Sequence, residues 1–353
     1  MPKLTKIAVI GAGKIASEVH LPLLSQMKDV KVSGIFDVDE GKAERLAKSF
    51  GVRTYNSVAH IADDGVMICD ICSPPQTHAE LVIECTSRGM NCIVEKPMAP
   101  TGVEAKKMFE AAEHTGTRVF PIQNLAFTPG MQRARKMIRA GKIGEVVNAN
   151  IRYYTSFSDH RHKHFLEKNH WINKLEGKVF ADHLIHLAYP LVEFIGPVSS
   201  VEAIKQDSFV QGSLVKQLEV VASSGRASGG LTLSFGTPVN QFMTEIIGAK
   251  GGLRVDGNSQ AVVSLRSISD SRSVFNRGLQ AMSEVVALSS NLVTTGARLV
   301  SGRYKPVIYG HNFLIRRCIL ALNSDLTYPV DPNCVVESLS FCERVFEQIK
   351  SSD

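Results

Sequence analysis

The chain has 353 residues, of which 44% are hydrophobic and 21% charged, which is typical of a globular protein long enough for two domains. No run of about 18 apolar residues is present, so a transmembrane helix is not expected. The apolar run near the N-terminus is too short for a signal peptide, and we therefore expect a cytoplasmic protein.

The charge and the cysteines exclude further classes of protein. The net charge of +6 is spread along the chain, whereas nucleic-acid-binding proteins concentrate their basic residues in one patch. Seven cysteines, an odd number in a long chain, do not indicate a disulfide framework. Cys69 and Cys72 have the spacing of a redox or zinc pair, but they lie in an apolar run, and we expect buried thiols.

The first third of the chain alternates short apolar runs with helical patterns. The expected strands are 6–10, 30–36, 52–55, 67–72 and 91–94, and the expected helices are 14–27, 41–50, a segment near 58, and 78–88. Strands that alternate with helices over short connections predict a parallel sheet covered by helices.

A glycine-rich turn follows the first expected strand and opens the first expected helix: Gly11-Ala12-Gly13-Lys14-Ile15-Ala16. Gly11 permits the tight turn, Gly13 lets the backbone approach a pyrophosphate, and Ala16 allows the helix to pack closely on the strand. The start of the helix offers free N–H groups to the phosphates. This pattern in this context predicts a Rossmann-type domain that binds a dinucleotide.

An acidic residue is expected about 20 positions further on, at the end of the second strand, and Asp37 meets that expectation. Its carboxylate would accept hydrogen bonds from ribose hydroxyls and repel a 2′-phosphate, so NAD is favoured over NADP. The alternative is that Asp37 and Asp39 only cap the next helix.

From residue 146 onward, longer strand-like runs are separated by turns. The expected strands are 147–154, 198–205, 218–222, 230–234 and 242–248, and the expected helices are 179–194 and 333–351. We therefore expect an α/β protein with an N-terminal Rossmann domain, residues 1–122, and a C-terminal α/β domain built on a large, mostly antiparallel open sheet, residues 123–353. The amphipathic segment 273–303 is interpreted as a helix packed on its own domain; a lid, an oligomer contact or a membrane-surface segment are the alternatives.

Two further motifs end the fourth and fifth expected strands: Ser73-Pro74-Pro75-x-x-His78 and Val94-Glu95-Lys96-Pro97. Together they resemble the signature of the Gfo/Idh/MocA oxidoreductases, the family of glucose–fructose oxidoreductase and inositol dehydrogenase. The resemblance extends over nearly the whole chain, through Asn124 with Phe127 and Pro129, and through the segments 140–144 and 247–253.

The resemblance implies where the cofactor binds. The implied cofactor-binding residues are Gly11, Ala12, Gly13, Lys14, Ile15, Asp37, Ser73, Pro74, His78, Glu95, Lys96 and Asn124. It also implies that the nicotinamide lies at the cleft between the domains, and that the Lys96–Pro97 peptide is cis, as it often is in the family.

Hydride transfer from a secondary alcohol needs a base for the hydroxyl proton and polar groups that fix the reacting carbon. Lys96 can stabilise the developing alkoxide, and Asp182 and His186, four residues apart on a helix, share a face. We expect His186 to accept the proton and Asp182 to orient the imidazole or contact a substrate hydroxyl. These three residues match the catalytic residues of the family. A core histidine is the alternative for His186, and His183 is expected to point elsewhere.

The chain departs from the family pattern at four positions. Leu184 and Tyr189 stand where the family often has a glycine and an acid, and Leu125 and Ala126 replace a common arginine. These differences leave the hydride chemistry intact but argue against the usual small polyol substrate.

A histidine-rich basic segment precedes the second catalytic motif: Asp159-His160-Arg161-His162-Lys163-His164, followed by Lys168, His170 and Trp171. Alternating histidines could bind a metal, but the basic residues between them would repel a cation, and no metal is expected. A solvated loop is the common outcome. The sharper hypothesis is a loop that contacts a phosphate, with Trp171 stacked on a sugar or base. The expected substrate contacts are Lys96, Asn124, His170, Trp171, Asp182 and His186.

The sequence therefore predicts an NAD-dependent dehydrogenase that oxidises a secondary hydroxyl of a sugar, polyol or nucleotide sugar. The alternatives are a reductase of a different carbonyl or imine substrate and a non-catalytic NAD-sensing regulator of the same fold. The expected partners are a saccharide-like small molecule, free, phosphorylated or nucleotide-linked, and no nucleic acid. The resemblance also implies a homodimer or homotetramer that pairs through the open sheet.

Overall fold

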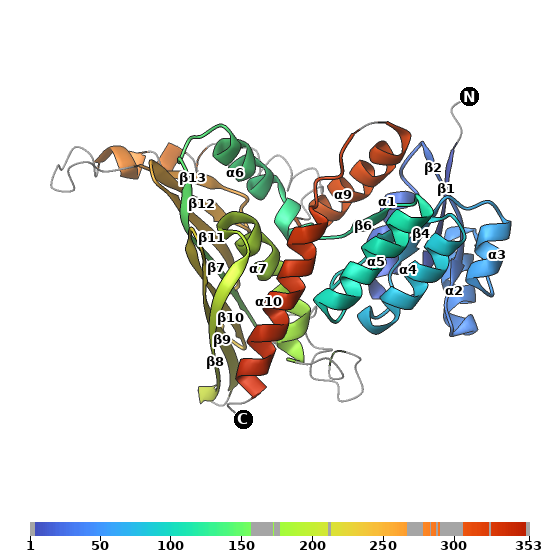
Figure 1. Ribbon diagram of the computed structural model, residues 1–353, viewed down its shortest axis with the longest axis horizontal. Coiled ribbons are helices and arrows are strands. Elements are labelled where there is room, and N and C mark those ends of the chain that lie inside the picture. The colour runs from blue at the N-terminus through green and yellow to red at the C-terminus, as the bar shows by residue number, and fades with distance from the viewer. Residues whose placement is uncertain are drawn as a thin grey trace. The chain divides into compact units, whose positions relative to one another are not determined.

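The computed structural model describes residues 4–156, 172, 177–210, 213–266, 278–282, 284–286, 289, 306–324 and 326–350. The chain forms two compact units (Figure 1), one of Met1–Gln123 with His311–Ser340 and one of Asn124–Gly310 with Phe341–Asp353. The segment 159–171 and most of the amphipathic segment 273–303 lie outside the described residues; of the latter, 278–282, 284–286 and 289 are helical.

The division differs from the expected domains in one segment. Residues 311–340 pack with the first unit, although the sequence analysis assigned them to the second domain. The helix that opens this segment buries four apolar side chains almost completely: Leu314, Ile315, Cys318 and Ile319. The periodicity of apolar residues shows that a helix face is buried but not which core it packs against. The sequence therefore did not indicate that residues 311–340 pack with the first unit.

The first unit contains a sheet of six parallel strands. They are β1 (Thr5–Ile10), β2 (Val30–Phe36), β3 (Arg53–Thr54), β4 (Ile68–Ile71), β5 (Asn91–Val94) and β6 (Val119–Pro121). Their order, β3-β2-β1-β4-β5-β6, is that of a Rossmann fold. The central strands β1 and β4 are buried along nearly their whole length, as their continuous apolar runs require. The predicted parallel sheet is confirmed.

The first unit also contains helices. They are α2 (Glu40–Phe50), α3 (Val58–Asp63), the short η2 (Pro75–Thr77), α4 (His78–Ser87), α5 (Gly102–Thr115), most of α9 (Pro306–Asn323) and the start of α10 (Pro332–Lys350). The helix expected over 14–27 contains a π-helical turn, η1 (Ala16–His20), before α1 (Leu21–Leu24). This wider turn ends at His20, whose side chain is fully buried.

The second unit is built on a seven-stranded sheet. Its strands are β7 (Val146–Thr155), β8 (Val198–Val210), β9 (Ser213–Ser224), β10 (Ser228–Phe235), β11 (Gln241–Gly248), β12 (Gly251–Asp256) and β13 (Val262–Arg266), in the order β13-β12-β11-β7-β10-β9-β8. Every neighbouring pair is antiparallel except β7 with β10. The predicted mostly antiparallel sheet is therefore confirmed.

Helices cover one face of this second sheet. η3 (Asn124–Phe127) and α6 (Pro129–Arg139) precede it, and α7 (Val179–Ile195) packs on β7, β9 and β10 (Figure 1). Nearly every side chain of α7 is buried, because its apolar residues occupy all sides of the helix. In the described part of the chain, no helix has the length and hydropathy needed to cross a membrane.

The cysteines are free thiols, six of them buried and Cys334 partly exposed. Burial raises the pKa of Cys72 to about 12, so this thiol stays protonated at neutral pH. The expectation of buried thiols at Cys69 and Cys72 is confirmed.

Candidate active site

The two glycines of the turn after β1 have different surroundings. Gly11 has φ +99°, and a Cβ there would lie 2.7 Å from the backbone nitrogen of Ser73, so only glycine fits. A Cβ on Gly13 would meet no atom of the described residues within 4 Å, and Gly13 is exposed. The protein itself therefore does not require glycine at 13. A ligand that approaches the backbone at this position would require glycine, and the pyrophosphate of a dinucleotide is such a ligand.

Asp37 follows β2 and holds the glycine turn. Its Oδ2 accepts a hydrogen bond from the backbone N–H of Ala12 at 2.7 Å, and its Oδ1 accepts one from the N–H of Asp39 at 2.8 Å. Both oxygens keep further lone pairs for ribose hydroxyls. Asp39, not Asp37, caps α2 through the N–H of Lys42, so the alternative of a simple helix cap does not account for Asp37.

The buried side chain of His78 contacts the backbone of the motif after β4. This ring is fully buried, and its nitrogens lie 2.8 Å from the carbonyl oxygen of Ser73 and 3.1 Å from that of Met98. Burial lowers the pKa of His78, so the neutral ring donates one hydrogen bond. Ser73 is half-buried and Pro74 exposed. His78 thus lies between the loop after β4 and the segment after β5 and donates to the carbonyl of one of them.

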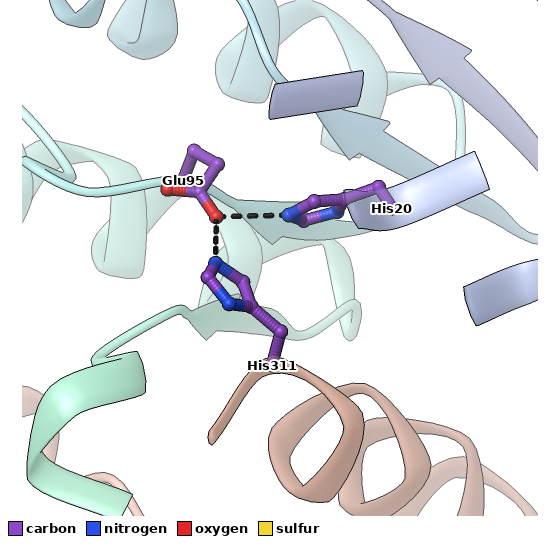
Figure 2. A group of neighbouring side chains, drawn as sticks. All are labelled: His20, Glu95 and His311. Carbon is purple, nitrogen blue, oxygen red and sulfur yellow. Dashed lines mark hydrogen bonds and ion pairs between the residues drawn. The ribbon is translucent and has the colours of Figure 1, made fainter. Parts of the chain in front are cut away.

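A network of buried ionisable residues surrounds the residue before Lys96. Glu95 lies directly after β5, and one of its oxygens, Oε1, is 2.8 Å from His20 Nε2 and 2.9 Å from His311 Nε2 (Figure 2). Its other oxygen accepts the backbone N–H of Lys96 at 2.9 Å. His20 Nδ1 in turn lies 2.8 and 3.0 Å from the two oxygens of Asp70. All four of these side chains are at most 5% exposed.

The electrostatics of this network favour ionised groups. Burial alone would lower the pKa of His20, but the charge of Asp70 and its hydrogen bond outweigh burial, and the pKa of His20 is well above its usual value. Burial would likewise raise the pKa of Glu95, yet the hydrogen bonds from His20 and His311 hold that pKa well below its usual value. Lys96 itself is half-buried, and its peptide bond to Pro97 is cis, as the resemblance implied.

Asn124 opens η3 in the second unit and is 3% exposed. Among the described residues its Oδ1 has no hydrogen-bond partner, which is unusual for a buried amide and fits a residue that contacts a ligand. Arg135 of α6 holds the same segment: its guanidinium donates to the carbonyl of Ala126, lies 4.4 Å from the ring centre of Phe127, and pairs with Glu193 of α7 at 2.6 and 2.5 Å.

Helix α7 carries the remaining predicted catalytic residues. Asp182 and His186 lie one helical turn apart in its first half, with the Asp182 side chain 13% exposed and His186 7% exposed. The expectation that His183 points elsewhere is wrong: its Nδ1 lies 3.4 Å from Asp182 Oδ2. The His183 ring also packs against Tyr153 and Phe235 of the sheet, and its centre is 6.2 Å from that of His186. Two residues adjacent on a helix can thus come close to each other when the packing of one side chain directs it toward the other.

The predicted site residues are thus distributed over both units. The glycine turn, Asp37, Ser73, Glu95 and Lys96 belong to the first, and Asn124, Asp182 and His186 to the second. His170 and Trp171 lie outside the described residues. The sequence analysis did not single out His20, His311 or Arg135. The available signal for His20 was a histidine in the helix after the glycine turn, a helix whose inner face is otherwise apolar.

The strand order, the glycine turn and the acid after β2 define a dinucleotide-binding protein with a second α/β unit. Residues 5–123 match the family described as an oxidoreductase family with an NAD-binding Rossmann fold, and residues 131–254 match the GFO/IDH/MocA C-terminal domain. The chain belongs to the GFO/IDH/MocA family. It is an NAD-binding oxidoreductase of that family, which confirms the predicted fold, cofactor and class of enzyme.

Individual relatives show how far the similarity extends. The chain is 27% identical over 220 residues to glucose-6-phosphate 3-dehydrogenase of Bacillus subtilis, a match that covers 61% of each chain. It is 25% identical over 257 residues to scyllo-inositol 2-dehydrogenase (NAD(+)) of the same organism, covering 70% of this chain and 72% of the relative. The chain thus spans less than two thirds of the first relative.

The fold also resembles solved structures over nearly its full length. One is the WlbA dehydrogenase from Bordetella pertussis, crystallised with NADH and UDP-GlcNAcA, with a TM-score of 0.78 and 19% identity. The similarity covers 99% of this chain and 97% of that one. At this identity it shows a shared fold.

Proposed function

We propose that this protein is an NAD-dependent dehydrogenase that oxidises a secondary hydroxyl of a sugar, polyol or nucleotide sugar. The observation that carries the proposal is the buried group of one carboxylate and two imidazoles on α7, Asp182, His183 and His186, in an NAD-binding oxidoreductase. Buried acid–base groups of this kind suit the removal of a hydroxyl proton.

Each residue has a distinct role in this proposal. NAD, when bound, would supply the acceptor for the hydride of the carbinol carbon. His186 accepts the hydroxyl proton as the carbonyl forms. Asp182 stabilises the positive charge that the imidazole gains. The ammonium group of Lys96 stabilises the alkoxide that develops on the substrate oxygen. The unpartnered amide oxygen of Asn124 supports a contact with cofactor or substrate.

The substrate is proposed to carry a phosphate or nucleotide group. The chain has a net charge of +6, and one relative is named for a phosphorylated sugar. The fold relative WlbA was crystallised with a nucleotide sugar. The basic segment 159–171, with His170 and Trp171, is the proposed contact for that group, since Arg and Lys recognise phosphates.

A substrate screen with matched variants tests these roles. Free sugars, polyols, sugar phosphates and nucleotide sugars are incubated with NAD, and NADH absorbance is recorded. Lys96→Ala and His186→Asn should each lower kcat by about 10²-fold or more while NAD still binds. Lys107→Ala, an exposed lysine of the same unit, serves as the control. If His183→Asn abolishes turnover and His186→Asn does not, the base is His183 and our assignment is wrong.

The same screen separates the alternative functions. A reductase of a carbonyl or imine would consume NADH with such substrates and show no reaction with alcohols. A regulator would bind NAD tightly yet turn over none of these substrates. Activity confined to free inositol would refute the proposed phosphate contact. The cytoplasmic location stays a prediction.

We also propose that the protein pairs through the outer face of the second sheet. Val221 of β9 and Ile204 of β8 are 62% and 71% exposed, and Val221 lies opposite Glu202, two residues from Ile204, so both project from one face. Exposed apolar residues that share a sheet face are typical of an interface. A lower mass in light scattering for Val221→Arg than for the wild type is expected; identical masses would contradict the proposal.

A further inference from the structure

The buried network around Glu95 must balance two negative charges. Asp70 and Glu95 are carboxylates, His20 and His311 are imidazoles, and all are nearly inaccessible to water. Buried carboxylates are costly unless positive charge lies beside them. A proton that makes His20 an imidazolium would supply positive charge here, and so would one divalent metal ion bound by His20, Glu95 and His311.

The distances favour protons. The two nitrogen–oxygen distances at Glu95 Oε1 are 2.8 and 2.9 Å, within the range of charge-assisted hydrogen bonds. Ligand atoms that surround a zinc ion tetrahedrally at about 2.0–2.1 Å lie roughly 3.3 Å apart. His20 has a carboxylate oxygen at each ring nitrogen, and an ionised carboxylate only accepts hydrogen bonds. Both nitrogens of His20 therefore carry a hydrogen, and the ring is an imidazolium.

The arrangement fixes Glu95 and, through it, the backbone of Lys96. Both imidazoles donate to Oε1 (Figure 2). Oε2 is thereby left to accept the backbone N–H of Lys96. The residues come from four places in the chain: the π-helical turn, β4, the end of β5, and α9. A π-helical turn inside a helix is frequent at functional sites, and here it ends at His20.

We propose that His20 and His311 are positioning residues for Lys96: they hold the Glu95 carboxylate in one orientation so that it anchors the Lys96 backbone. The inference rests on the proposed role of Lys96 in catalysis. A displacement of about 1 Å in a reacting group can cost 10²-fold in rate, which gives such an anchor its value. The proposal assigns these residues no contact with substrate or cofactor.

Variants at 311 test the proposal because they can keep or remove a single hydrogen bond. His311→Gln retains an N–H that can donate to Glu95 Oε1, whereas His311→Leu cannot donate. We expect His311→Leu to lower kcat roughly 10-fold or more with little change in the KM of NAD, and His311→Gln to restore most of it. Cys318→Ala on the same helix, which leaves a cavity in the buried face and replaces none of the four hydrogen-bonded residues of the network, is the control for lost stability.

A second measurement does not depend on turnover. The amide hydrogen of Lys96, bonded to Glu95 Oε2, should exchange with solvent faster in His311→Leu than in the wild type, and not in His311→Gln or Cys318→Ala. Unchanged exchange in His311→Leu would overturn the positioning role. Faster exchange with unchanged kcat would overturn the positioning role if Lys96→Ala does lower kcat. If Lys96→Ala leaves kcat unchanged as well, the failure lies in the proposed function. One equivalent of zinc bound by the wild type and lost in His311→Gln would overturn the assignment of protons.

Discussion

Replacing Arg135 with methionine tests whether one buried cation holds the second unit together. The side chain of Arg135 is 6% exposed and that of its partner Glu193 25%, so the substitution strands a carboxylate that only partly regains water. Removing one partner of a buried pair costs about 3–5 kcal/mol, and the partial exposure of Glu193 places this case near 3 kcal/mol. For a unit of this size, 1 kcal/mol corresponds to about 2–4 °C, so Tm should fall by about 6–12 °C.

The assay is thermal unfolding followed by circular dichroism, with three companion variants. Arg139→Met, at an exposed position of the same helix, should change Tm by no more than about 1–2 °C. The double variant Arg135→Met with Glu193→Leu should recover part of the loss, because no charge is then left alone. The single variant Glu193→Leu gives the loss of stability that this change causes in the wild type. If Glu193→Leu causes the same loss in Arg135→Met, the two residues are not coupled and the reasoning fails.

Three further predictions concern the first unit. Asp37→Ser should weaken NAD binding by about 10-fold or more, through loss of hydrogen bonds to a charged group, and narrow the preference for NAD over NADP; unchanged KM values for both would contradict the assignment. Thr101→Ala should cost about 1 kcal/mol in urea unfolding, since Thr101 Oγ1 caps α5 through the N–H of Glu104 at 3.1 Å; no change would mean the cap is replaced by water. The free energy of unfolding of the wild type should exceed that of His20→Gln most between about pH 4.5 and 6.5. The raised pKa of His20 in the folded protein makes its contribution full below the unfolded pKa, and the contribution declines above that value and is lost as the pH rises through the folded pKa. The lowered pKa of Glu95 keeps the contribution of Glu95 until the pH falls below the usual pKa of a glutamate. An advantage that grows with pH would refute this sign.

Local sequence patterns correctly predicted helices and strands whose ends are marked by residues that stop them. The expected strands 30–36 and 91–94 coincide with β2 and β5, and the expected helix 179–194 coincides with α7 to within one residue, because Gly196 and Pro197 end it. Helix α5 was not anticipated, although Thr101 caps it through the N–H of Glu104 and donates its hydroxyl to the Glu104 carboxylate. Its apolar positions are small and sparse, so the periodicity is weak even where the cap is clear.

The network around Glu95 shows what a local pattern cannot predict. His20 meets residues 50 and 75 positions away, and Glu95 meets His311 across 216 positions. No period of a helix or strand relates these positions, and each histidine alone is indistinguishable from an ordinary core residue. The π-helical turn that places His20 is likewise a product of tertiary packing. By contrast, the glycine turn and Asp37 were predictable because strand, turn and acid lie close in sequence.

The single parallel pair in the second sheet bears on when helix α7 reaches its final position during folding. β7, residues 146–155, pairs with β10, residues 228–235, and α7 lies in the chain between them and packs on both strands. Contacts between distant segments form only after the entropy of closing a long loop has been overcome. Asp182 and His186 therefore gain their final surroundings only once this pair has formed. We expect a newly made chain to complete its glycine turn, which local segments build, before its acid–base group exists.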